Sequence, residues 1–152
     1  MADKNKILIG SDELGFPLKE VVKAHLLSKG YEVIDVGTDN APVKGSKAIQ
    51  KGEVDRAIIM CGTGMNVNIT CNKHKGVRCG LVESEFTAEM SRAINNCNVM
   101  AMGARVVSDF RAKQMVDIWL NTEFTAGLPI EHKPLLEGML VNLGKMEDEN
   151  FK

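Results

Sequence analysis

The sequence has no CxxC pair, no apolar run long enough to span a membrane and no excess of either charge. Its four cysteines, at positions 61, 71, 79 and 97, fit no zinc pattern and indicate a reducing compartment. A net charge of −1 argues against nucleic acid or an anionic membrane as the main partner. The polar start, Met1–Lys6, lacks the features of a signal peptide. We therefore expect a cytoplasmic protein.

The chain has 152 residues, 44% of them hydrophobic and 26% charged, with no internal repeat. This length and composition are typical of one soluble domain, expected to span residues 1–152.

Short apolar runs alternate with segments of helical periodicity. Because the runs are rich in Val and Ile and do not strictly alternate, they predict strands buried on both faces. The repeat predicts an α/β fold with a doubly wound, five-stranded, mostly parallel sheet. The predicted strands are Lys6–Ile9, Glu32–Val36, Arg56–Met60, Val77–Val82 and Asn98–Met102. The predicted helix stripes are Leu18/Val21/Val22/Leu26, Phe86/Met90/Ala93/Ile94 and, after a Ser108 cap, Met115/Val116/Trp119/Leu120.

Two segments are less regular. Thr38–Gly52 contains Pro42 and Gly45, so it predicts only a short helix from about Ser46. The tail, residues 131–152, has Leu136, Met139, Leu140 and Leu143 at helical spacing. It predicts an amphipathic helix over Pro134–Lys145, docked on this subunit or on a neighbour. Residues 147–150 are expected to fray.

Three loops follow predicted strands: Gly10–Phe16, Cys61–Asn66 and Gly103–Arg105. In an open parallel sheet, ligands bind at this edge. Gly62-Thr63-Gly64 turns the chain into a helix predicted over Asn66–Lys73. The glycines permit close backbone approach, and the helix N–H groups favour a developing negative charge. A small buried role for Cys61 and a chemical role both fit this pattern.

Other polar residues also have two interpretations each. Asp12 either binds hydroxyl groups and relays a proton or caps the helix that starts near Pro17. Arg105 either holds a phosphate or forms a surface ion pair. The histidines at 25, 74 and 132 fit solvated or structural roles.

In these loops and strands the sequence resembles the family of ribose-5-phosphate isomerase B and the subunits of galactose-6-phosphate isomerase. The resemblance runs from about Lys6 to Phe124. It is carried by Ile9–Asp12 with Gly15, Phe16, Lys19 and Glu20, by Gly30–Thr38, Gly52–Asp55, Cys61–Gly64, Asn72-Lys73, Gly76–Arg78, Thr87-Ala88, Asn98-Val99, Gly103–Val107 and Val116, Asp117, Trp119 and Leu120.

This resemblance implies a Rossmann-like fold that dimerises, with sites built from both subunits. It implies that Cys61 moves a proton between C1 and C2 of a sugar phosphate through an enediolate, that Thr63 and Asp12 are catalytic, and that no metal or organic cofactor takes part. The expected substrate-binding residues are Ser11, Glu13, Gly62, Gly64, Met65, Asn66, Asn95 and Arg105.

The chain departs from the family pattern at several positions. It keeps the half of the composite site with Asp12 and the Cys61 loop, and it lacks the ring-opening His and the tail arginines that are usually donated across the dimer. Glu13 stands where the family usually has His, and Asn66 where it has Gly. A Tyr-Pro segment after Gly37-Thr38 is missing. Ile94 occupies the place of the ring-opening His, although it also completes the predicted helix stripe. Ala126–Pro129 replaces the Gly-Gly-Arg-His motif whose arginines bind phosphate.

Two classes of function remain open. One is an aldose–ketose isomerase of the ribose-5-phosphate or galactose-6-phosphate type. It would act as one subunit of a composite pair, like the B subunit of galactose-6-phosphate isomerase with an A-type partner, or as a divergent homodimer on an open-chain substrate. The other is a sugar-phosphate-binding homologue without catalysis. A dinucleotide-binding domain is disfavoured because the first loop lacks GxGxxG.

Overall fold

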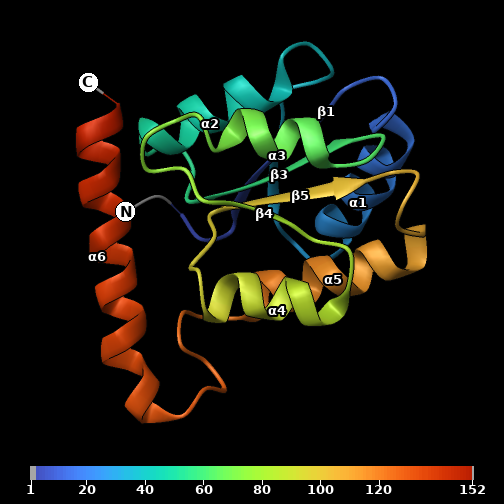
Figure 1. The fold of residues 1–152 in the computed structure, drawn as a ribbon. Helices are drawn as coiled ribbons and strands as arrows, with labels where there is room; N and C mark the ends of the chain where they lie inside the picture. The colour runs from blue at the N-terminus through green and yellow to red at the C-terminus, as the bar shows by residue number, and fades with distance from the viewer. Residues whose placement is uncertain (1–2, 152) are drawn as a thin grey trace.

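Five parallel strands form the centre of the computed structural model, which describes residues 3–151 (Figure 1). Their order in the sheet is β2-β1-β3-β5-β4, and every neighbouring pair is parallel. The predicted parallel sheet is therefore confirmed. The strands are β1 (Lys6–Ser11), β2 (Glu32–Asp35), β3 (Arg56–Cys61), β4 (Cys79–Leu81) and β5 (Val99–Gly103).

Helices cover both faces of the sheet. Helices α1, α4 and α5 pack on one face and α2 and α3 on the other, which is the doubly wound arrangement (Figure 1). The helices are α1 (Phe16–Ser28), α2 (Ala41–Gln50), α3 (Met65–Cys71), α4 (Glu85–Ala93), α5 (Asp109–Asn121), the 3₁₀ turn η1 (Ile130–His132) and α6 (Lys133–Asn150).

Alternation along the strands explains why two cores form. Ile7, Ile9 and Met60 belong to the apolar cluster under α1, α4 and α5. Leu8 and Cys61 belong to the cluster under α2 and α3. Because successive side chains of a strand point to opposite faces, a strand covered by helices on both sides must be apolar throughout.

Two of the three predicted helix stripes are confirmed. In α1, Leu18, Val22 and Leu26 are buried and Val21 is half-buried. In α5, the four predicted residues are all buried, and the Ser108 hydroxyl caps the helix by accepting from the Arg111 N–H at 3.4 Å.

The stripe predicted for α4 is confirmed only in part, because Ala93 is buried and Met90 and Ile94 are half-buried, whereas Phe86 is 69% exposed. The helix also buries Ala88 and Arg92, which the stripe did not include. The buried Arg92 donates to the carbonyl oxygens of Cys97 and Thr122, so its polar groups are satisfied.

Three boundaries also differ from prediction. Helix α2 begins at Ala41 rather than Ser46, because Pro42 in the first turn needs no N–H partner. Its Gly45 lies close to Ile59, where a Cβ would be 3.0 Å from the Ile59 side chain. Helix α3 covers Met65–Cys71, and the strand predicted over Val77–Val82 shortens to β4.

Helix α6 stands beside the amino ends of the strands (Figure 1). It is longer than predicted and does not fray over residues 147–150: Glu147 accepts from the Gly76 N–H at 3.0 Å, and Asp148 pairs with Lys75 at 2.6 Å. Of its residues only Leu136 is buried. Within residues 3–151, no helix combines the length and apolarity needed to cross a membrane.

Candidate active site

Three loops meet at the carboxyl ends of β1, β3 and β5, which are neighbours in the sheet. The Asp12 N–H donates to the Met60 carbonyl at 3.1 Å. The N–H groups of Ala104 and Arg105 donate to the carbonyls of Cys61 and Gly62, both at 2.9 Å. The predicted meeting of these loops at one edge is therefore present.

Two glycines let the loops touch backbone to backbone. A Cβ on Gly15 would lie 2.6 Å from the Met60 carbonyl oxygen. A Cβ on Gly103 would lie 2.5 Å from the Thr63 carbonyl carbon. Any side chain at either position would push the neighbouring loop away from Cys61.

Cys61 ends β3 on the face covered by α2 and α3 and is only 4% exposed. Its sulfur accepts a hydrogen bond from the Gly64 N–H at 3.1 Å. Gly64 has a positive φ of 79° and so can aim its N–H back at the sulfur. Next to it, the exposed Thr63 hydroxyl accepts from the Met65 N–H at 3.3 Å. This loop can place negative charge on sulfur beside a backbone donor.

Asp12 is half-buried beside this loop, and its Oδ1 accepts from the Gly15 N–H at 2.8 Å. Gly15 is the N-cap residue of α1, which has no side-chain cap hydrogen bond, so Asp12 holds the turn before the helix rather than capping it. The Oδ2 atom has no hydrogen-bond partner among residues 3–151. Asp12 can therefore hold this turn and still offer one oxygen to a ligand.

The remaining residues of this edge are exposed. Arg105 forms no ion pair within residues 3–151, and a Cβ on Gly62 would lie 3.9 Å from its Cδ. Its guanidinium stem thus lies beside the cysteine loop. The other predicted ligand-binding side chains that are exposed here are Glu13, Met65 and Asn66.

Ser11 differs from these exposed residues. It is fully buried, and its hydroxyl has no hydrogen-bond partner within the described residues. Ser11 aligns with Met60 in the β1–β3 register, so strand alternation turns it to the face opposite Cys61. The Ser11 hydroxyl therefore does not share the face of Cys61, and a substrate contact by Ser11 remains a prediction.

Asn95 also lies away from Cys61 in the same chain. It follows α4 and precedes β5, at the amino end of the sheet, whereas Cys61 lies at the carboxyl end. The length of β5, roughly 13 Å, separates the two ends.

The Thr125 N–H donates to the Ala93 carbonyl at 2.9 Å, which places the 125–129 segment beside Ile94. Ile94 and the Ala126–Pro129 segment, two of the departures from the family pattern, thus share one surface.

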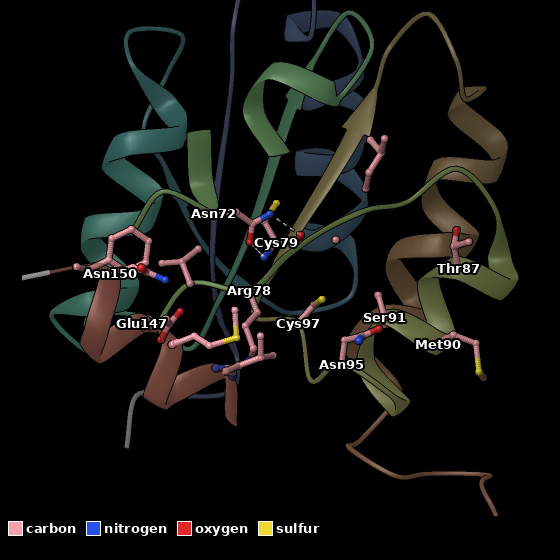
Figure 2. A pocket seen from close by; sticks show the side chains of 16 residues that line it. Asn72, Arg78, Cys79, Thr87, Met90, Ser91, Asn95, Cys97, Glu147 and Asn150 are labelled. Carbon is pink, nitrogen blue, oxygen red and sulfur yellow. Dashed lines mark hydrogen bonds between the residues drawn. The ribbon is translucent and has the colours of Figure 1, made fainter. Parts of the chain in front are cut away.

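A cavity of about 580 Å³ lies between α6 and the body at this amino end. Figure 2 shows Glu147 of α6 on one side of it, Ser91 and Asn95 of the α4 end on the other, and Arg78 and Cys97 between them. This cavity was not predicted from the sequence, although the apolar stripe of the tail, which includes the lining residue Leu143, could have indicated it.

The other three cysteines lie away from the carboxyl edge of β3. Cys71, Cys79 and Cys97 are all buried. Burial raises the pKa of Cys97 to about 11, and the hydrogen bond with Cys71 together with burial raises the pKa of Cys79. Over residues 3–151, no cluster of three or more His, Cys, Asp or Glu could hold a metal ion.

An ion cluster around one buried lysine lies beneath the first loop and was not predicted. Lys19, with a side chain only 3% exposed, pairs with Asp35 at 2.6 Å and with Glu20 at 2.8 Å. Lys23 pairs with the same Asp35 oxygen at 2.8 Å. Burial opposes ionisation of Asp35, but the two lysines outweigh it and lower the pKa of the carboxyl to about 2.

This cluster predicts an acid-sensitive stability. A carboxyl whose pKa is lowered by folding stabilises the protein above its ordinary pKa of 3.8, and the stabilisation is lost as the pH falls toward 2. Wild type should lose about 2 kcal/mol more free energy of unfolding than Asp35→Asn between pH 6 and pH 2. Urea denaturation at fixed protein concentration measures the difference. Parallel curves for the two proteins would contradict the assignment.

Comparison with known proteins agrees with this geometry. Residues 7–135 match the family model described as Ribose/Galactose Isomerase. The chain is 40% identical over 157 aligned positions to 4-deoxy-4-sulfo-D-erythrose isomerase of Clostridium sp. (strain MSTE9), covering 97% of this chain and 98% of that one. It is 41% identical over 130 positions to ribose-5-phosphate isomerase B of Escherichia coli, covering 80% and 87%. The structure of Clostridium thermocellum ribose-5-phosphate isomerase B superposes with a TM-score of 0.84 at 37% identity, over 95% and 99% of the chains.

Proposed function

The chain belongs to the ribose/galactose isomerase family, enzymes that interconvert aldoses and ketoses, and from this premise we propose that Cys61 is its acid–base group. The position of Cys61 carries the proposal. Its sulfur lies at the carboxyl edge of the sheet, accepts a backbone N–H, and is flanked by Thr63 and Asp12. A group that moves the proton in such a step contributes roughly 10²- to 10⁴-fold to the rate.

The proposed reaction starts from the open-chain aldose. The Cys61 thiolate takes the proton from C2, the C2–H electron pair becomes the C1=C2 bond, and the carbonyl pair moves to O1. The resulting enediolate is negatively charged, which suits the backbone donors of the Gly62–Gly64 loop. Cys61 then returns the proton to C1. The free Oδ2 of Asp12 carries the hydroxyl proton from O2 to O1, and the ketose forms.

The substrate that fits this chain best is a four-carbon sugar that cannot form a ring. Ribose-5-phosphate and galactose-6-phosphate cyclise, so their isomerisation needs a proton relay for ring opening. Ile94 cannot supply one. The relative from Clostridium sp. is named for 4-deoxy-4-sulfo-D-erythrose, which has no C4 hydroxyl and therefore stays open. We propose that this chain acts on an erythrose-type aldose with a sulfonate or phosphate at C4.

Arg105 is our proposed anchor for that terminal anion. A short substrate with C1 and C2 at Cys61 keeps its C4 group near the same loop. Arg105 donates its backbone N–H to Gly62 and has no ion-pair partner in residues 3–151, so its guanidinium can take an anion. The family's tail arginines are missing here, and Leu128 lies in their segment. This loss fits a substrate whose anion is bound by Arg105 at the carboxyl end of the sheet instead.

Deuterium labelling tests the reaction. The purified chain is incubated in D₂O with 4-deoxy-4-sulfo-D-erythrose or D-erythrose-4-phosphate, and the product is followed by NMR. We expect the ketose, with deuterium at C1 wherever the Cys61 proton exchanges with solvent. Binding of either sugar with no conversion and no exchange at C2 would instead support the binding-module alternative.

We also propose that the active form is a dimer in which the Ile94–Leu128 end of one copy lies against the Cys61 end of the other. Both ends expose apolar side chains that need a covering surface. They are Leu14, Met65, Phe86 and Phe110 at the carboxyl edge and Leu135, Met139, Val141, Leu143 and Met146 on α6. Sedimentation at micromolar concentration should show no major monomer. A fully active monomer would contradict this arrangement, and activity that appears only after adding an A-type subunit would replace it with a hetero-oligomer.

A further inference from the structure

A closed ring of hydrogen bonds links the ion cluster around Lys19 to Asp12. Its first part runs from Lys19 to the end of β1. The Lys19 ammonium donates to Asp35 Oδ2 at 2.6 Å, and the Gly37 N–H donates to Asp35 Oδ1 at 2.9 Å. The Gly37 carbonyl then accepts from the Ser11 N–H at 3.1 Å. One carboxylate therefore joins α1 to the end of β2 and, through Gly37, to the residue before Asp12.

The second part of the ring returns from Asp12 to Lys19. Asp12 Oδ1 accepts from the Gly15 N–H at 2.8 Å, and the Gly15 carbonyl accepts from the Lys19 N–H at 2.9 Å. Backbone and side chain of Lys19 thus close the ring from both directions. Because Oδ1 of Asp12 is fixed in this way, the orientation of its free Oδ2 is fixed as well.

The ring rests directly on the cysteine strand. The Asp12 N–H donates to the Met60 carbonyl, and Gly15 lies so close that a Cβ there would be 2.9 Å from the Cys61 nitrogen. A shift in the ring therefore moves Asp12 relative to Cys61.

Burial and charge keep the ring closed. Lys19 is nearly inaccessible, and its ammonium lies 5.1 Å from the centre of the Phe16 ring. Burial opposes its charge, but the hydrogen bonds to Asp35 and Glu20 outweigh this and raise the pKa of Lys19, while Asp35 stays ionised. Because the Lys19 ammonium is buried, breaking its bond to Asp35 would leave a poorly compensated charge, which disfavours opening of the ring.

We propose that Lys19 is a positioning residue for the reaction: through Asp35, Gly37 and Gly15 it holds the free oxygen of Asp12 in place beside Cys61. This role rests on the proposed function, because it requires Asp12 to act on the substrate. Lys19 itself touches no reacting atom. Its effect on turnover passes entirely through Asp12.

The matched comparison is Lys19→Met against Lys23→Met. Both variants remove one lysine from the same Asp35 oxygen, but Lys23 is not part of the ring. With far-UV circular dichroism unchanged, Lys19→Met should lower kcat roughly 10- to 100-fold with little change in KM. Lys23→Met should change kcat less than twofold. If Lys19→Met fails to fold, Asp35→Asn opens the same ring, because the Asn NH2 group would face one of the two donors, the Lys19 ammonium or the Gly37 N–H.

A double-mutant cycle separates positioning from general damage. In an Asp12→Asn background, Lys19→Met should lower kcat less than twofold further, because the residue it positions is already gone. A full additional loss overturns the proposal, as does a Lys19→Met variant with wild-type kcat.

The hydrogen-bond ring can also be monitored by NMR, without measuring turnover. The amide NMR signals of Gly15 and Gly37 should shift in Lys19→Met and not in Lys23→Met. If the wild type shows no isomerisation, the proposed function fails. If the two amides do not move in Lys19→Met, the positioning proposal fails by itself.

Discussion

Cys61→Ala is expected to lower turnover by at least about 10²- to 10⁴-fold while the fold stays intact. Alanine cannot take the C2 proton, whereas every backbone contact of the loop, including the Ala104 N–H bond to the residue-61 carbonyl, remains. Turnover is measured with a sugar that wild type isomerises, and folding by circular dichroism and thermal melting.

Cys71→Ala is the matched control. Cys71 is also buried on the α2/α3 side of the sheet, but it is the last residue of α3 rather than the end of a strand. This variant should lose roughly 0.5–3 kcal/mol of unfolding free energy and keep near-normal turnover. Near-normal turnover in Cys61→Ala would show that another group moves the proton.

Gly103→Ala should lower turnover about 100-fold. The new methyl group would meet the Thr63 backbone at 2.5 Å, and backbone cannot rotate away as a flexible side chain can. The cysteine loop must therefore shift, and misplacement by about 1 Å can cost 10²-fold in rate. The strain should also cost roughly 1–3 kcal/mol of unfolding free energy. Steady-state kinetics and urea denaturation measure the two effects.

Gly138→Ala provides the comparison for this glycine. Gly138 lies within α6, and nothing within 4 Å would meet its Cβ. Alanine there should leave turnover unchanged and raise helix stability by up to about 1 kcal/mol. If Gly103→Ala retains wild-type kcat, the close approach of the two loops does not determine the geometry of the site.

The sheet, α1 and α5 could be predicted from the sequence because burial produces a regular spacing of apolar residues. The Leu18/Val22/Leu26 stripe and the stripe around Trp119 each face one core. In α4 the same logic failed at Phe86, which is exposed, and gave no sign that Arg92 is buried. Arg92 is buried because its guanidinium meets backbone carbonyls and lies 5.6 Å from the Trp119 ring, and spacing alone cannot reveal such partners.

The candidate site was predictable only in part for a similar reason. Cys61 and Asp12 end neighbouring strands, so topology brings them together. The contact of Lys19 with Asp35 could not be predicted from the sequence. A lysine beside an apolar stripe normally faces solvent, and only the fold places Asp35 opposite it. Asn95 lies at the far end of the sheet, where one chain alone cannot bring it to Cys61.

The preference between open-chain and ring-forming sugars most directly tests the proposal that this chain acts on a four-carbon sugar that cannot form a ring. Values of kcat/KM are measured for the purified chain alone on 4-deoxy-4-sulfo-D-erythrose, D-erythrose-4-phosphate, D-ribose-5-phosphate and D-galactose-6-phosphate. Because Ile94 supplies no ring-opening relay, at least one four-carbon substrate should exceed both ring-forming sugars by about 100-fold or more. Equal or faster turnover of ribose-5-phosphate or galactose-6-phosphate by the chain alone would contradict the account.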